Sequence, residues 1–154
     1  MIRVEMTWIE IWAAMQIGLM RAMKHMQART ENRNGDHGQL GIDNDVLGAI
    51  GEAALAKWKN RFWLGGRVGD IDVDSCYEAR ACCRPQHSMM LHPWDKDELP
   101  YVNALVLRHE LPCVTLRGWV YGAEGKQPEF WRDDVPRPAF FVPAGTLWSM
   151  SQLP

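Results

Sequence analysis

The sequence predicts a single α/β (α+β) domain, 1–154, in which two N-terminal helices precede a central mixed β-sheet. Near the N-terminus, apolar residues recur at three- and four-residue steps, as in amphipathic helices. From Phe62 onward the pattern changes to short extended segments separated by Gly and Pro turns. At 47% hydrophobic and 23% charged residues, the composition is that of an ordinary globular domain. We therefore expect an N-terminal helix over 1–30, a polar loop over 31–42 and a core over 43–154.

The first helix should begin at the capping box formed by Thr7 and Glu10 and end near Arg29. One apolar stripe follows it, comprising Trp8, Trp12, Met15, Leu19, Met23 and Met26. A stripe at this spacing is typical of a helix face that packs into the core, and we expect it to be buried. The alternative is a surface for a membrane or for a partner helix.

The second helix should be capped by Asp43 or Asn44 and run to about Asn60. Its glycines and alanines give it a thin face suited to close packing. Glu52 lies in its middle, and read alone it is typical of an exposed helical glutamate. The strands are expected at Phe62–Val68, Ile71–Val73, Tyr77–Cys83, Met89–His92, Val102–Arg108, Cys113–Val120 and Ala139–Val142, with a loop-rich region over 122–138 and a short terminal helix over Gly145–Met150.

The most informative stretch is the run of alternating acids that ends in Glu78-x-Arg80. Period-two alternation places Asp70 and Asp72 on one face of a strand. If residues 74–76 form a three-residue hairpin loop, Asp72 lies opposite Glu78, and Asp70 lies opposite Arg80. Carboxylates held this close repel unless a divalent cation lies between them, so we expect a Mg²⁺ or Mn²⁺ site. A register change of one residue would place the acids on opposite faces.

The net charge of −2 argues against nucleic-acid binding, which usually leaves a basic footprint. The charge is uneven, however, and a local basic rim near the acidic motif is a candidate for phosphate contacts. Its candidate residues are Lys57, Lys59, Arg61, Arg67 and Arg84.

Two further expectations concern the thiols and the cellular location. Zinc binding by the group Cys76, Cys82, Cys83, His87 and His92 is disfavoured because no C-x-x-C pair exists. Small buried thiols are the expected role, with a zinc or redox role for Cys76, Cys82, Cys83 and Cys113 as the alternative. No secretory signal or spanning segment is apparent, which predicts a cytoplasmic protein without membrane contact.

Several motifs together resemble the PD-(D/E)XK nuclease superfamily, which has the restriction-endonuclease-like fold. The helix Gly48-Ala49-Ile50-Gly51-Glu52-Ala53-Ala54 resembles the G-x-x-G-E-x-A helix of small phage-encoded members. The runs 94–97, 101–102, 117–122 and 139–143 are similar to the same group, and the likeness covers roughly 48–153.

The resemblance implies that Glu52, Asp70 or Asp72, and Glu78 hold one or two Mg²⁺ (or Mn²⁺) ions, with Arg80 as the basic residue of the motif. It implies metal-dependent hydrolysis of phosphodiester bonds in DNA, in the host cytoplasm if the chain is phage-encoded. Within this interpretation, a small single domain without a separate recognition module suggests structure-selective or weakly sequence-selective cutting. It also allows a homodimer. Arg80 stands where the family usually has Lys, and arginine stays charged where lysine can lose a proton. The alternative is therefore a catalytically inactive protein on this fold that binds nucleic acid or protein.

Overall fold

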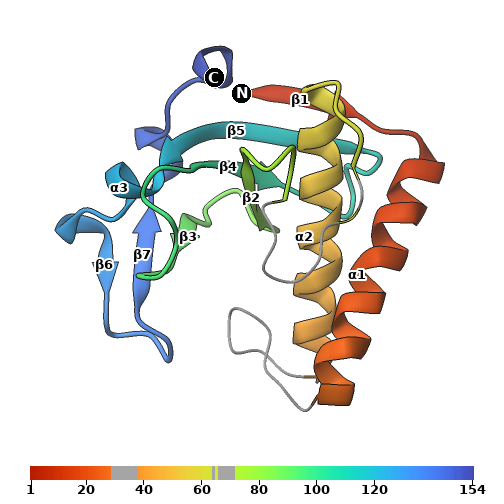
Figure 1. The fold of residues 1–154 in the computed structure, drawn as a ribbon, viewed down its shortest axis with the longest axis horizontal. Helices are drawn as coiled ribbons and strands as arrows, with labels where there is room; N and C mark the ends of the chain where they lie inside the picture. The colour runs from red at the N-terminus through yellow and green to blue at the C-terminus, as the bar shows by residue number, and fades with distance from the viewer. Residues whose placement is uncertain (29–37, 64, 66–71) are drawn as a thin grey trace.

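The computed structural model describes residues 1–28, 38–63, 65 and 72–154, and its elements form two helices packed on a mixed sheet, with a small second sheet beside it (Figure 1). The elements are β1 (Ile2–Glu5), α1 (Trp8–Ala28), α2 (Gly38–Trp58), β2 (Glu78–Cys82), β3 (Met89–Leu91), β4 (Pro100–Leu105), β5 (Cys113–Tyr121), α3 (Gly122–Gly125), β6 (Trp131–Arg132) and β7 (Ala139–Val142). Short 3₁₀ turns cover Pro128–Phe130, Ala144–Thr146 and Met150–Gln152. The α/β class with two N-terminal helices is thereby confirmed.

The four-stranded sheet has the order β1-β5-β4-β2. Strands β2 and β4 are parallel, with Glu78 opposite Tyr101, whereas β4–β5 and β5–β1 are antiparallel. Helix α2 lies against β2 and β4, so closely that a Cβ added at Gly51 would lie 3.0 Å from the Ala104 Cβ. The expected thin face of this helix is confirmed, and it brings the middle of α2 next to the start of β2.

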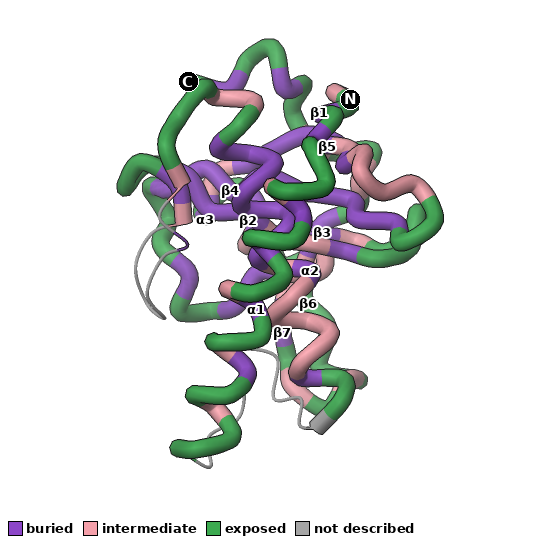
Figure 2. The backbone as a smooth tube through the Cα atoms, turned by 90° about the vertical axis from the view of Figure 1, so that its right-hand side faces the viewer, coloured by how far each residue is buried: buried purple, intermediate pink, exposed green. Residues whose placement is uncertain are grey.

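Helix α1 begins at the predicted capping box, but its apolar stripe does not face the core. The Thr7 hydroxyl accepts the Glu10 N–H, and the Glu10 carboxylate accepts the Thr7 N–H. The face packed on α2 consists of Ile11, Ala14, Gly18 and Ala22. Small side chains let the two helices approach closely: a Cβ added at Gly18 would lie 2.5 Å from the Val46 Cα. The large residues of the stripe therefore face solvent, and our expectation of burial was wrong (Figure 2).

Helix α2 begins at Gly38, five residues before the expected cap at Asp43. The Gln39 side chain donates to the Asp43 carboxylate, an i,i+4 contact that supports the additional turn. Asp43 therefore lies inside the helix and is not its N-cap, and its carboxylate also pairs with Arg108. Of the predicted polar loop, 31–37 lies outside the described residues and the rest is helical.

The strands predicted from Tyr77 onward are confirmed, whereas the strands predicted before Tyr77 need correction. Phe62 and Trp63 have no regular structure, and most of the strand expected at Phe62–Val68 lies outside the described residues. Beyond Leu105 the chain leaves β4 three residues earlier than expected. The sequence reading missed β1, although Ile2, Val4 and Met6 alternate as in a strand, because four residues give little periodicity.

The C-terminal third forms the antiparallel sheet β3-β7-β6 and folds back on β5. Strand β7 matches the predicted range, whereas the two-residue β6 was not expected. Instead of a helix over Gly145–Met150, the chain forms 3₁₀ turns, and Trp148 makes an antiparallel bridge with Trp119. None of the helices in the described part of the chain has the length and apolar character needed to cross a bilayer.

Candidate active site: a buried carboxylate cluster

The hairpin predicted before Glu78 is present. Val73 and Tyr77 exchange both backbone hydrogen bonds at 3.0 Å, which leaves residues 74–76 as the loop. Asp74 and Ser75 have φ of 53° and 55°, the left-handed conformation that such tight turns require. In this register Asp72 and Glu78 follow as the next opposed pair, and the Asp72 carboxylate accepts the Ala79 N–H at 2.9 Å. Asp70, and with it the expected pairing to Arg80, lies outside the described residues.

Glu52 is buried rather than exposed, because a guanidinium from α1 reaches across to it. Its exposed fraction is 5%, and Arg21 donates two parallel hydrogen bonds to its carboxylate, at 2.6 and 2.7 Å. The Trp63 indole N–H adds a third, at 3.3 Å. The bidentate geometry is the strong form of the arginine–carboxylate pair. The hypothesis of an exposed helical glutamate was wrong.

The Arg80 guanidinium lies between two buried carboxylates. It donates to Glu78 at 2.8 Å and to Asp95 at 3.1 Å, and its carbon lies 4.7 Å from the centre of the Tyr101 ring. Asp95 in turn accepts the His92 N–H at 2.8 Å. Burial lowers the pKa of Arg80, but the Asp95 and Glu78 carboxylates outweigh this and raise it, so the guanidinium remains charged.

We call Glu52, Asp72, Glu78 and Asp95 the carboxylate cluster. Three of its members are 5–6% exposed, and Asp72 is partly buried. Burial raises the pKa of Asp72 well above its usual value, and the Glu52 and Glu78 carboxylates raise it further. Burial and the Asp95 carboxylate likewise raise the pKa of Tyr101 to about 12. If all four acids are ionised, they oppose only the two guanidinium groups described above, which leaves an excess of two negative charges.

Residues of the cluster that sequence reasoning missed come from distant elements. They are Arg21, on α1, and Asp95, in the loop between β3 and β4. Neither position has a local signal for its role, because each finds its partner across the fold, 31 residues away for Arg21 and 15 for Asp95.

The expected basic rim is largely committed to other partners. Lys57 pairs with Glu10 at 2.7 Å, Arg61 pairs with Asp74 at 3.2 Å, and the Lys59 ammonium donates to the carbonyl of Pro154. Arg84 is exposed beyond β2, and Arg67 lies outside the described residues. Contact of these five residues with DNA stays a prediction.

The carboxylate cluster suits a hard divalent cation in charge and donor type. Among the described residues, no three His, Cys, Asp or Glu side chains are gathered with the spacing of a metal site. The cluster nevertheless supplies oxygen ligands, which Mg²⁺ and Mn²⁺ prefer, and an excess charge equal to that of one such ion. The pKa of Asp72 is raised first by burial and then by the Glu52 and Glu78 carboxylates, and a divalent cation between these groups would oppose both effects.

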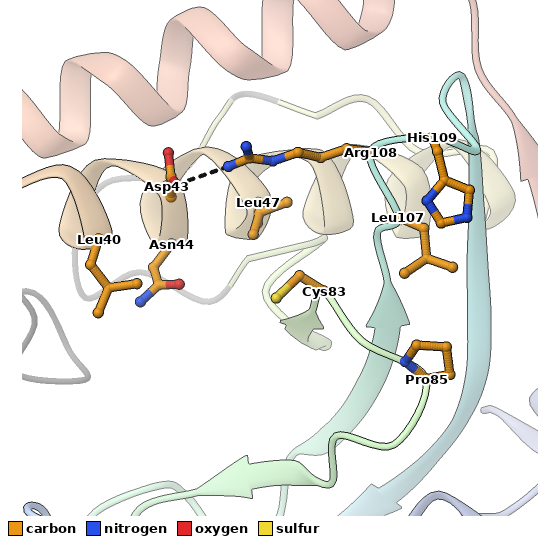
Figure 3. Close-up of a pocket in the computed structure, with 9 residues that line it drawn as sticks. All are labelled: Leu40, Asp43, Asn44, Leu47, Cys83, Pro85, Leu107, Arg108 and His109. Atoms are coloured by element: carbon orange, nitrogen blue, oxygen red, sulfur yellow. Dashed lines mark hydrogen bonds and ion pairs between the residues drawn. The ribbon is translucent and has the colours of Figure 1, made fainter.

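The cysteines differ in burial, and one of them lines a surface groove. Cys82 is buried, Cys76 and Cys83 are exposed, and Cys113 is half-buried, so the expectation of buried thiols holds for Cys82 alone. Cys83 lines a groove of about 380 Å³ between the start of α2 and the loops that follow β2 and β4 (Figure 3). The Asp43–Arg108 ion pair spans one side of this groove. No described group of thiols and imidazoles has a zinc arrangement.

Comparisons with family models, with curated proteins and with solved structures found no match to this chain. A functional assignment therefore rests on the chemistry of the cluster itself.

Proposed function

We propose that the chain is a metal-dependent phosphodiester hydrolase acting on DNA, with Glu52, Asp72 and Glu78 as the residues that would hold Mg²⁺ or Mn²⁺. The observation that supports this most is the meeting of Asp72 with the buried Glu52 and Glu78 carboxylates, where burial and these two neighbours raise the pKa of Asp72. Acids are rarely gathered out of solvent without a cation, since each costs several kcal/mol to desolvate. Asp70 is a further candidate ligand from the sequence resemblance.

The residues of the cluster have separate roles in this proposal. A divalent cation bound there would lower the pKa of its bound water and would neutralise charge on the phosphate. Arg80, held between Glu78 and Asp95, cannot act as a base, and it stabilises charge that develops on the phosphate oxygens. Arg21 positions Glu52 through its bidentate contact. Structure-selective cutting of branched or single-stranded DNA is what a small single domain without a separate recognition module suggests.

A second candidate function is a non-catalytic binding module on the same fold. It is favoured by one observation: both guanidinium groups already pair with the acids that would bind the metal. In this alternative Arg80 and Arg21 lock the cluster as a structural network. Partial neutralisation of the basic rim by Glu10 and Asp74 fits it as well.

The deciding experiment is cleavage of linear duplex, single-stranded and four-way-junction DNA with Mg²⁺, Mn²⁺ or EDTA. Asp72→Asn is the test variant, because the amide oxygen can still accept the Ala79 N–H while the charge is lost. Asp134→Asn is the matched control, since that carboxylate is exposed and pairs with Arg132 on a distant surface. The proposal expects cleavage that needs the cation and is lost in Asp72→Asn but retained in Asp134→Asn.

Calorimetry with Mn²⁺ separates the two candidates when no DNA is cut. Binding of Mn²⁺ that is lost in Asp72→Asn, without cleavage, would keep the metal site and reject the hydrolase for the substrates tested. Absence of both binding and cleavage would reject the metal centre and leave the binding module.

A further inference from the structure

The exposed face of α1 is an apolar surface that the fold itself does not use. The large residues on it, with their exposed fractions, are Trp8 (63%), Ile9 (80%), Trp12 (64%), Met15 (39%), Leu19 (37%), Met20 (58%), Met23 (53%) and Met26 (52%). We call these eight residues the α1 stripe. It extends over about 27 Å of helix, at 1.5 Å per residue. Figure 2 shows α1 exposed along most of its length, with its buried positions confined to the side that packs on α2.

The area of the α1 stripe is that of one side of a protein–protein interface. Scaled by about 200 Å² for a large apolar residue, the eight exposed fractions correspond to an area on the order of 900 Å². A specific interface buries about 800 Å² on each partner, whereas the largest apolar patch of a monomer is about 300–600 Å². The stripe thus exceeds what a monomer usually leaves in water and matches what a dimer needs.

The charge of this face points to protein rather than to a lipid surface. The polar residues on it are Gln16 and Gln27, and Lys24 at its edge is the one charged residue that α1 exposes fully. Helices that bind anionic membranes have rows of Lys and Arg flanking the apolar face. On the same flank as Lys24 lies Glu10, which already pairs with Lys57, and the other flank packs on α2. Depletion of charge with enrichment in Trp and Met is the composition of an interface core.

The spacing of the stripe fits a second helix of the same kind. Trp8, Trp12, Met15, Leu19 and Met26 are separated by four, three, four and seven residues, which is the seam of a two-helix coiled coil. Its two ends differ in chemistry, with indoles at the N-terminal end and flexible thioethers at the C-terminal end. In an antiparallel pair, the indoles of one helix lie against the thioethers of the other. This contact is favourable because Met side chains pack well on aromatic rings.

We propose that two copies of this chain associate through the α1 stripe, with the helices antiparallel about a two-fold axis that passes between Met15 and Leu19. In this arrangement Met15 lies against Leu19 of the second copy, Trp12 against its Met23 and Trp8 against its Met26. Each contact occurs twice, as a closed two-fold interface requires. The resemblance allowed a homodimer without indicating a surface, and the proposal does not depend on the carboxylate cluster.

The first test is the mass of the native chain by size exclusion with light scattering over a dilution series. We expect twice the 17.7 kDa of one chain, falling to one copy only at the lowest concentrations. Trp12→Glu should yield a monomer at every concentration. Trp94→Glu is the matched control, because Trp94 is 61% exposed but lies between β3 and β4, and it should remain a dimer. Helicity by circular dichroism checks that each variant is folded.

The second test addresses the antiparallel pairing by exchange of charge. Met23→Lys alone should also be monomeric, whereas an equimolar mixture of Trp12→Glu and Met23→Lys chains should regain a dimer that contains one of each. A parallel pairing would place each new charge opposite an uncharged residue and would not be rescued.

A monomeric native chain would overturn the proposal, and so would a dimer that Trp12→Glu leaves intact. Sedimentation with vesicles of neutral and anionic phospholipid completes the test. Binding of a monomeric chain to vesicles, lost in Trp12→Glu, would assign the stripe to a lipid surface instead.

Discussion

Asp72→Asn should make the metal-free protein more stable at neutral pH, although it removes a residue of the candidate active site. In the native chain the Asp72 carboxylate is partly buried and repelled by Glu52 and Glu78, and these effects raise its pKa. The substitution removes the charge and keeps an oxygen that can accept the Ala79 N–H at 2.9 Å. What is lost is therefore mainly the repulsion and the cost of desolvating a carboxylate.

The magnitude and the sign follow from proton linkage. A raised pKa means that the folded state binds a proton more tightly than the unfolded state, in which the pKa is about 3.9. The destabilisation by Asp72 is absent below the unfolded-state pKa. It grows as the pH rises from the unfolded-state pKa to the folded-state pKa, and it is complete above the folded-state pKa. Each unit by which the folded-state pKa exceeds the unfolded-state pKa corresponds to about 1.4 kcal/mol, so we expect the variant to be measurably more stable than the native chain at pH 7.

The assay is urea denaturation in EDTA at a series of pH values between 4 and 8. The free energy of unfolding of the native chain should decline relative to that of Asp72→Asn as the pH rises from 4, and the difference should be smallest at pH 4. Asp134→Asn, which removes an exposed carboxylate, controls for net charge. A variant that is less stable than the native chain at pH 7, or a difference that does not change with pH, would refute the reasoning.

Three further predictions concern the ion pair, the cation and the helix contact. Arg21→Met should cost about 2–4 kcal/mol in the free energy of unfolding, because Glu52 is left buried without its partner. Arg132→Met breaks an exposed pair and should leave the free energy of unfolding nearly unchanged in the same urea titration. Mg²⁺ or Mn²⁺ at about a hundredfold above its Kd should stabilise the native chain by about 2.7 kcal/mol, a shift of about 5–10 °C by differential scanning fluorimetry, and should fail to shift Asp72→Asn. Gly18→Ala should destabilise the native chain by about 1–3 kcal/mol. Gly48→Ala, where an added Cβ meets nothing within 4 Å, should be neutral or stabilising. Equal effects of the two substitutions in the urea titration would contradict the close contact between Gly18 and Val46.

The sequence predicted the elements whose causes are local. The Thr7–Glu10 capping box, the three-residue hairpin loop after Val73 and the strand at Ala139–Val142 all depend on residues within a few positions of one another. The hairpin in turn placed Asp72 opposite Glu78, and so half of the candidate site was predictable from alternation and turn chemistry. The start of α2 was not, because a polar segment that reads as loop was held helical by the Gln39–Asp43 contact.

The α1 helix illustrates what periodicity leaves open. Its apolar stripe identified a helix and its length, but two faces competed for the core. The large stripe would bury the greater hydrophobic area, whereas the face with Ala14, Gly18 and Ala22 packs on α2 because its small residues allow the close approach of Gly18 to Val46. Shape complementarity between two helices is a property of the pair, and the pattern of one helix does not contain it.

By itself, then, the sequence determined the class of fold, the two helices, the hairpin and the acids that meet across it, since these follow from contacts between near neighbours in the chain. Only the tertiary structure decided that Glu52 is buried, that Arg21 and Asp95 join the cluster, and that the large apolar face of α1 remains in solvent. Each of these depends on residues brought together from distant elements. Their charge and burial are set by partners that no local pattern specifies.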